Sequence, residues 1–272
     1  MVFGGIPFYL SLINAKESLV QNVDRLFFAQ GGIMRSEFDE LYNALFSNAD
    51  LYISVVKGLA AHHDGMSREE ISKATGITGG TLTRVLTNLE RCDFISRNQN
   101  FAHKVKDTIY RLVDFYTLFY YKFILPDVSG DEQWWSHHFE SRQVSTWQGL
   151  TFEIVCLMHT DSIKRALGIS GMATEVSSWR KAATDGQNGG QIDLVIKRAD
   201  RIIHLCEMKF SKSQYRITEA YEQLLRQRLE LFQSSTKTKY SLVITFVTTY
   251  GIADGLHHSL VHSEVTMEQL FI

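Results

Sequence analysis

The first part of the chain carries hydrophobic residues at helical spacing. Val23, Leu26 and Phe27 fall on one face of a helix, and the same spacing returns after a pair of glycines at positions 31 and 32. Residues 1–50 are therefore predicted to be helical. The pattern changes after residue 50, where shorter helical stretches are followed by two β-strand signals.

Residues 51–113 predict three helices and a β-hairpin. A first helix covers residues 51–61, and Ser67 with Glu70 forms a capping box that opens a second helix. Gly76 is placed to end that helix in the left-handed conformation. The third helix begins near residue 78 with one apolar stripe, and a hairpin follows with its polar tip at residues 98–100. This order is typical of a winged helix-turn-helix.

The polar face of the third helix has the composition of a nucleic-acid-binding surface. Short hydroxyls, an amide and one arginine suit the phosphates and base edges of a DNA groove. The residues expected to point outward are Thr81, Thr83, Arg84, Thr87 and Asn88. The helix holds only two cations, Arg84 and Arg91, so a module that packs against other domains and never meets DNA is an equally good interpretation.

A second domain is predicted after an aromatic linker. Residues 110–124 indicate a strand that runs into a buried aromatic helix, and the acidic, Trp-bearing residues 131–140 mark the expected domain boundary. From residue 141 the pattern is helix, three strands, helix and strand. That order fits a mixed sheet flanked by helices, so the fold class is α+β or α/β, with a helical and winged-helix first part.

The strand predicted at residues 203–209 carries the clearest chemical signal. One face is apolar apart from Glu207 and Lys209, and the other is apolar apart from His204, so the strand is expected to be central and buried. Asp193 lies on the preceding strand, and a turn centred on Asp200 would place it opposite Glu207. Two carboxylates about 4 Å apart repel by about 4 kcal/mol. A proton, a lysine or a hard cation such as Mg²⁺ would relieve that repulsion.

These acids and the lysine resemble a known motif. Asp193 followed by Glu-Met-Lys at residues 207–209 is similar to the core of the PD-(D/E)XK nuclease superfamily, whose order of helices and strands matches the one expected here. Glu153 matches an acid that such domains often carry on their first helix, and Gln223 resembles a further polar position. Ile192 precedes the first acid where the motif has proline.

The resemblance extends over nearly the whole chain. Residues 4–10 (GGIPFYL), the winged helix, the aromatic linker and the nuclease-like domain together resemble the C-terminal half of prokaryotic, archaeal-ATPase-like AAA+ proteins. It implies a helical, lid-like segment at residues 1–50, a winged helix with its linker helix at 51–125, and a nuclease-like domain at 141–272. No GxxxxGK[ST] motif occurs, so ATP hydrolysis is not expected, and an ATPase module in cis or in trans is an expected partner.

The resemblance also implies metal-dependent cleavage of DNA. Asp193, Glu207 and the Met208 carbonyl would hold Mg²⁺ or Mn²⁺, Lys209 would orient the attacking water, and Glu153 would act from the outer shell or hold a second ion. Two alternatives stay open. Glu207 and Lys209 would be a solvated ion pair on an edge strand, or the chain would be an inactive DNA-binding or protein-interaction module that regulates an ATPase.

Composition narrows the class of protein. The chain has 272 residues, is 44% hydrophobic and 21% charged, and carries a net charge of −2, which argues against a disordered, collagen-like or coiled-coil protein. No apolar run approaches the ~20 residues of a membrane span. The three cysteines are far apart and form neither a disulfide framework nor a zinc cluster, and Cys206 is expected to be a small core residue. A reducing cytoplasm is the expected location.

Two weaker candidate sites follow from spacing alone. His258 and His262 lie four residues apart, as a helical metal-binding pair would, although two solvated histidines are the more ordinary interpretation. Arg180 and Lys181 precede the loop that leads to Asp193, and they would contact phosphate or simply face solvent.

Overall fold

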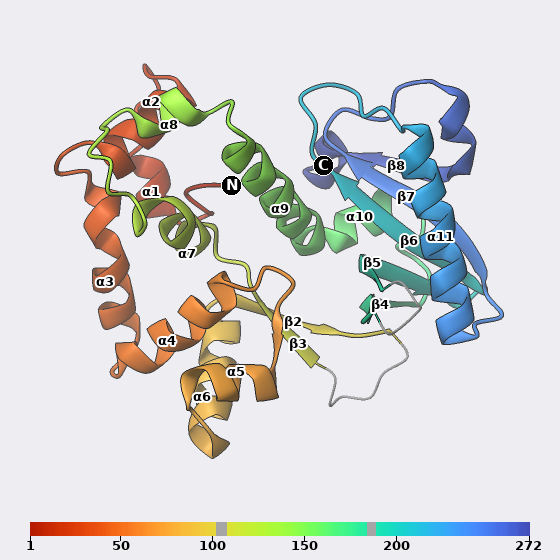
Figure 1. Cartoon of the computed structure of the whole chain (residues 1–272), viewed down its shortest axis with the longest axis horizontal. Helices are drawn as coiled ribbons and strands as arrows, with labels where there is room; N and C mark the ends of the chain where they lie inside the picture. Colours follow the sequence, from red (N-terminus) through yellow and green to blue (C-terminus); the bar gives the residue numbers. More distant parts are fainter. Residues whose placement is uncertain (102–107, 184–188) are drawn as a thin grey trace. The chain divides into compact units, whose positions relative to one another are not determined.

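The computed structural model describes residues 1–101, 108–183 and 189–272. These residues form two compact units (Figure 1). The first unit comprises Met1–Asn98 and Thr108–Gln148, and the second comprises Gly149–Ile272 together with a short segment that begins at Gln99.

The first unit is helical apart from a small three-stranded sheet. Its elements, in chain order, are α1 (Pro7–Ser11), α2 (Leu19–Val23), the π-helix η1 (Asp24–Phe28), α3 (Ile33–Leu45), α4 (Ala49–Ala60), β1 (Met66–Ser67), α5 (Arg68–Thr75), α6 (Gly79–Arg91), β2 (Ile95–Gln99), β3 (Thr108–Leu112), α7 (Phe115–Phe119), the π-helix η3 (Tyr120–Ile124) and α8 (Trp134–His138). The helical character predicted for residues 1–50 is confirmed.

Elements α4 to β3 form a winged helix. A helix, a short strand, two helices and two strands follow one another, and the sheet order is β1-β3-β2. Ser67 and Glu70 exchange the hydrogen bonds of a capping box at the start of α5, and Gly76 ends that helix at a φ of 72°. Leu82 and the other apolar residues of the α6 stripe are buried. The local signals in the sequence therefore predict this part of the fold correctly.

Gly65 permits the close approach of β1 and β3. Its φ is +84°, and a Cβ at this position would lie 2.5 Å from Cγ2 of Ile109 and 2.7 Å from Cγ of Arg111. A larger residue would have to push the two strands apart, since β1 pairs with β3 immediately afterwards, at Met66 and Ser67.

The hairpin after α6 differs from the prediction. Residues 98–100 are predicted to form its tip, but β2 continues through Gln99. Asn100 and Phe101 belong to the second unit, where Asn100 bridges Ser178 and its side-chain oxygen accepts a hydrogen bond from the Arg180 N–H at 3.2 Å. The polar run is thus used for pairing with a strand rather than for a turn. The chain between residues 101 and 108 lies outside the described part.

The aromatic residues after β3 form the core of the first unit. Phe119 packs against Phe27 with ring centroids 4.8 Å apart and against Trp135 at 5.1 Å. Trp135 lies on α8, inside the stretch predicted to be the domain boundary, and Asp24 accepts a hydrogen bond from its N–H at 2.8 Å. That stretch therefore packs within the first unit, and the division between the units comes after Gln148.

The second unit is a mixed sheet flanked by helices. Its elements are α9 (Arg142–Met158), which begins in the first unit, α10 (Thr160–Ala166), β4 (Thr174–Lys181), β5 (Gly190–Arg198), β6 (Ile202–Lys209), α11 (Glu219–Thr236), β7 (Ser241–Thr248), the 3-10 helix η4 (Leu256–Leu260), β8 (Val261–Thr266) and the 3-10 helix η5 (Met267–Leu270). The predicted order of helix, three strands, helix and strand is confirmed, and α10 and β8 are additions to it.

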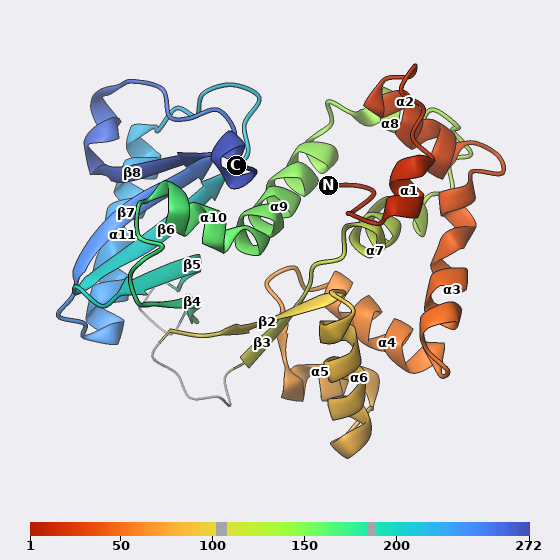
Figure 2. The same ribbon diagram turned by 180° about the vertical axis from the view of Figure 1, so that it is seen from behind.

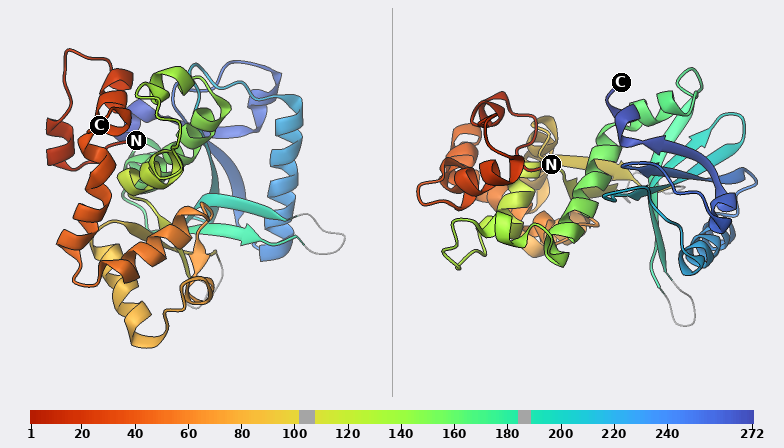
Figure 3. Two further views of the ribbon diagram at one scale, coloured as in Figure 1. Left: turned by 60° about the vertical axis from the view of Figure 1, so that its left-hand side comes forward. Right: turned by 90° about the horizontal axis from the view of Figure 1, so that it is seen from above.

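The five strands lie in the order β4-β5-β6-β7-β8 (Figure 2). Strands β4, β5 and β6 are antiparallel, whereas β7 and β8 run parallel to β6 and to each other. Cys206 and Met208 pack with Phe152 and Cys156 of α9 on one face, while Leu205 packs with Phe232 of α11 on the other. Figure 3 shows the two helices on opposite faces of the sheet. Strand β6 is thus central and covered twice, as its pattern predicts.

No helix among the residues that the structure describes combines the length and the apolar character needed to cross a bilayer.

Candidate functional site

The antiparallel pair β5–β6 carries the two predicted acids. Leu194 pairs with Cys206 and Lys197 pairs with Ile203, so the register is symmetric about Asp200. The pairing ends at Leu194 and Cys206, and Asp193 and Glu207 are the next residues on their strands. The turn inferred from the sequence is therefore the turn that the two strands make.

A β-bulge lies at Asp193. Ser177 pairs with Val195, but Trp179 pairs with Ile192, so β5 uses one more residue than β4 over this interval. As a result Ile192 and Val195 share one apolar cluster although they are three residues apart. Bulges re-aim side chains and recur beside active sites. Gln191 Nε2 donates a hydrogen bond to Asp193 Oδ1 at 2.8 Å and so helps to orient this carboxylate.

Both oxygens of the Glu207 carboxylate have partners. Oε1 accepts from the guanidinium of Arg228, and Oε2 accepts from the Tyr221 hydroxyl at 2.7 Å. Lys209 Nζ lies 3.7 Å from Oε2 and 5.0 Å from the centre of the Tyr221 ring. Glu207 is only 8% exposed, so its charge needs these cations. Burial, and then the neighbouring Glu207 charge, raises the pKa of Tyr221, which keeps that hydroxyl a donor.

Arg228 responds to both acids. Burial lowers the pKa of its guanidinium, but the charge of Glu207 and, more weakly, that of Asp193 raise it above its ordinary value. The hydrogen bond of this guanidinium goes to Glu207, and Asp193 acts on it only through its charge. Tyr221 and Arg228 are missed by the sequence analysis. Their separation of seven residues on a predicted helix, which puts them on one helix face, is the signal that points to them.

The acids fit a divalent cation in number and type, but a protein cation occupies one of them. Among the described residues, no three His, Cys, Asp or Glu side chains gather into a group that would hold a metal ion. An ion here would rest on Asp193 and Glu207, with a main-chain carbonyl and water as further ligands, which is a usual arrangement for Mg²⁺. Arg228 holds the Glu207 carboxylate instead.

Two other predicted site residues lie away from this group. Glu153 is on α9, where burial and the Glu153 charge raise the pKa of Cys156. That helix covers the face of β6 opposite to Glu207, because Cys156 packs with Cys206. Gln223 is exposed on α11. The helix that carries Glu153 and the Glu207 carboxylate therefore lie on opposite faces of the sheet.

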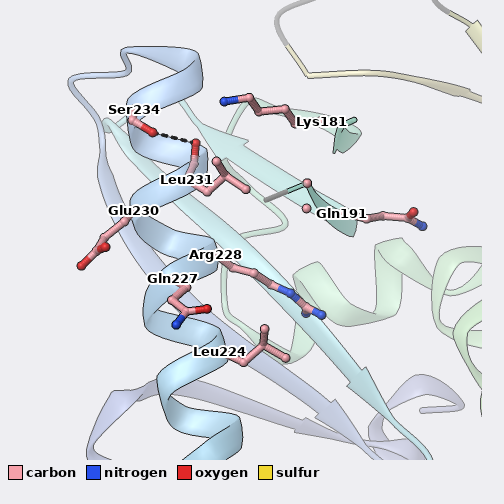
Figure 4. A pocket seen from close by; sticks show the side chains of 10 residues that line it. Lys181, Gln191, Leu224, Gln227, Arg228, Glu230, Leu231 and Ser234 are labelled. Carbon is pink, nitrogen blue, oxygen red and sulfur yellow. Dashed lines mark hydrogen bonds between the residues drawn. The ribbon is translucent and has the colours of Figure 1, made fainter. Parts of the chain in front are cut away.

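A pocket opens beside Arg228, between α11 and the β4–β5 pair (Figure 4). Its volume is about 850 Å³. The residues that line it include Lys181, Gln191, Leu224, Gln227, Arg228 and Leu231. In Figure 4 the Arg228 side chain extends from α11 across the sheet, whereas Glu230 points the other way. Of the two cations predicted near this loop, Lys181 thus lines a pocket with Arg228.

The surface of α6 offers part of the predicted nucleic-acid face. Thr81, Thr83 and Arg84 are exposed. The Thr83 hydroxyl accepts a hydrogen bond from the Arg68 guanidinium at 2.9 Å. Thr87 and Asn88 are half-buried, and the Asn88 amide donates to the Tyr52 hydroxyl at 2.8 Å. The expectation that Asn88 points outward is therefore wrong, because its amide ties α6 to α4.

The weaker candidates do not form sites in the described structure. His258 lies in the 3-10 helix η4 and His262 lies on β8, so no single helix carries them as a pair. Cys206 is 2% exposed and belongs to the core, as expected.

Comparisons with known proteins identify no family. No family model matches the chain, and no curated protein matches it. Among solved structures, a mutant of MepR from S. aureus aligns with 20% sequence identity over 52% of this chain and 99% of its own length, at a TM-score of 0.21. A TM-score this low supports no conclusion about function, and the winged helix described above is defined by its own helices and strands.

Proposed function

We propose that the second unit is a metal-dependent phosphodiesterase that cleaves nucleic acid, with Asp193, Glu207 and Lys209 as its catalytic residues. One observation supports this proposal: Lys209 Nζ lies 3.7 Å from Glu207 Oε2 on the central strand, and Asp193 lies on the adjoining strand, next to the pair Leu194–Cys206. Two acids and a lysine on adjoining strands are the set that this chemistry uses.

Each side chain has a role that follows from its contacts. Mg²⁺ or Mn²⁺, when held by Asp193 and Glu207, supplies an activated water and polarises the phosphate. Lys209 orients the attacking water and stabilises the negative charge that develops on the phosphate. Tyr221 fixes the Glu207 carboxylate through its hydroxyl hydrogen bond. Arg228, at the edge of the pocket, meets a phosphate oxygen.

Cleavage of plasmid and single-stranded DNA in Mg²⁺ and in Mn²⁺ tests this function. Asp193→Asn and Lys209→Met are expected to lower the rate by about 100-fold or more, because each removes a group that acts on the reacting atoms. Asp200→Asn and Lys197→Met are matched controls, since they change the same charges on the same strand pair away from the site. Absence of cleavage in both metals, or equal loss in the controls, rejects the proposal.

We also infer that the winged helix binds DNA through α6. The exposed Thr81 and Arg84 support this, because short hydroxyls and arginine suit phosphates and base edges. Arg84→Ala should weaken duplex binding and reduce the salt slope by about one. Lys73→Ala is the control, since Lys73 is an exposed cation paired with Glu69 on the neighbouring helix. Equal binding by the wild type and Arg84→Ala at two salt concentrations rejects groove docking.

A further inference from the structure

The α11 helix delivers two contacts to one carboxylate. Tyr221 and Arg228 are seven residues apart, which places them on the same face two turns apart, and each engages a different oxygen of Glu207. Lys209 approaches Oε2 from the same strand as Glu207. A metal ion that bound this carboxylate would share its oxygens with these partners.

Protein cations already compensate the charge of Glu207. Its carboxylate lies against the positive charges of Lys209 and Arg228. A divalent cation that approached it would therefore meet the repulsion of these two cations. Loss of the Arg228 charge would remove one of them, which favours the ion.

Arg228 also faces a pocket. It lines the pocket beside the site, and its side chain is 28% exposed, so it is not enclosed by its contact with Glu207 (Figure 4). A guanidinium binds phosphate through two parallel hydrogen bonds. Lys181 lines the same pocket from β4 and would add a second contact to an anion.

We propose that Arg228 is the resting counter-ion of Glu207, which keeps the affinity for divalent cations low until a phosphodiester in the pocket takes the guanidinium away. This inference rests on the proposed function for its substrate, but not for its central claim about the free protein. Substrate and metal ion would then bind with positive coupling, because each favours the state in which Arg228 has left the carboxylate.

Direct binding of Mn²⁺, measured by electron paramagnetic resonance without nucleic acid, tests the central claim. Arg228→Met should bind Mn²⁺ about tenfold or more tightly than the wild type, because the competing charge is gone. Arg228→Lys should stay near the wild type, and Arg226→Met is the control, since Arg226 pairs with Glu222 rather than Glu207. The gain in affinity should vanish in Glu207→Gln/Arg228→Met.

The outcomes separate this inference from the proposed function. Equal Mn²⁺ affinity in the wild type and Arg228→Met, or a gain that survives Glu207→Gln, overturns it. Arg228→Gln replaces Arg228→Met if the latter does not fold. If Arg228→Met gains affinity for Mn²⁺ but the wild type cleaves no DNA, the inference stands and the proposed nuclease function is rejected. If the wild type cleaves DNA but Arg228→Met gains no affinity, the function stands and the inference is rejected. Saturating thymidine dinucleotide should tighten Mn²⁺ binding to the wild type but not to Arg228→Met. Equal effects on both proteins would show that the dinucleotide does not draw Arg228 away from Glu207.

Discussion

The contact between Glu207 and Arg228 should make a measurable contribution to the stability of the second unit. Glu207 is 8% exposed and the Arg228 side chain 28% exposed, so neither charge is fully hydrated. Removal of one partner from a buried ion pair costs about 3–5 kcal/mol. Glu207→Gln leaves Arg228 and Lys209 without the anion that both of them contact, and we expect a loss of about 3 kcal/mol in the free energy of unfolding.

Substitution of Arg228 should cost less than substitution of Glu207, and the double variant should lose less stability than the sum of the two single variants. In Arg228→Met the carboxylate keeps Lys209 and the Tyr221 hydroxyl, so the expected loss is about 2 kcal/mol. When both charges are removed, no unpaired ion stays buried, and Glu207→Gln/Arg228→Met should lose only about 2 kcal/mol. The coupling energy of this double-mutant cycle is then about 3 kcal/mol.

Urea unfolding of the four proteins, followed by circular dichroism at neutral pH, measures the coupling. The exposed pair Glu69 and Lys73, one turn apart on α5, is the control, and its cycle should show a coupling of about 0.5 kcal/mol or less. If the losses from Glu207→Gln and Arg228→Met add within about 0.5 kcal/mol, the two side chains do not share a buried ion pair and the reasoning is refuted.

Three further predictions concern other parts of the chain. Burial lowers the pKa of His204 from 6.5 to about 4, so the folded protein holds this side chain neutral. Because the unfolded chain binds the proton first as pH falls below 6.5, the free energy of unfolding should decrease by up to about 2 kcal/mol by pH 5. Urea unfolding should show this decrease in the wild type but not in His204→Gln. Gly65→Ala should lower the free energy of unfolding by about 2–4 kcal/mol, because the residue has a left-handed φ and the added Cβ would clash with β3. Gly130→Ala is the control, since Gly130 has a φ of +67° with open space around it, and it should cost about 1 kcal/mol. Equal losses of stability in thermal melting would argue against the clash. Phe101→Ala should lower stability by about 1–2 kcal/mol, because its ring packs 5.1 Å from that of Phe232, and unchanged hydrogen exchange of the β4 amides would contradict this.

The turn between the two acid-bearing strands could be predicted because its parts are close together in the chain. Asp193 and Glu207 lie on consecutive strands joined by a tight turn, and the observed register is symmetric about Asp200, as predicted. The partners of Glu207 were not visible, because Tyr221 and Arg228 come from a later helix, 14 and 21 residues away. The path of that helix over the sheet decides which side chain reaches the carboxylate.

In the wing of the winged helix, a local sequence signal was overridden by a distant part of the chain. Asn98, Gln99 and Asn100 have the composition of a turn, and an isolated hairpin would use them as one. In the folded chain Asn100 bridges Ser178 at the edge of the five-stranded sheet. An exposed strand edge offers unpaired backbone groups, and pairing with any available strand satisfies them, so the local turn preference is overridden.

The sequence by itself determined the features that depend on neighbours a few residues apart: the capping box at Ser67, the left-handed Gly76, the buried stripe of α6 and the two apolar faces of β6. The tertiary structure alone decided that Arg228 neutralises Glu207, that α9 carries Glu153 to the other face of the sheet, and that β8 adds a fifth strand. The physical reason is the distance along the chain over which each interaction acts. Helix caps and strand alternation are settled by the energy of adjacent residues, whereas the partner of a buried charge is settled by which distant element packs against it.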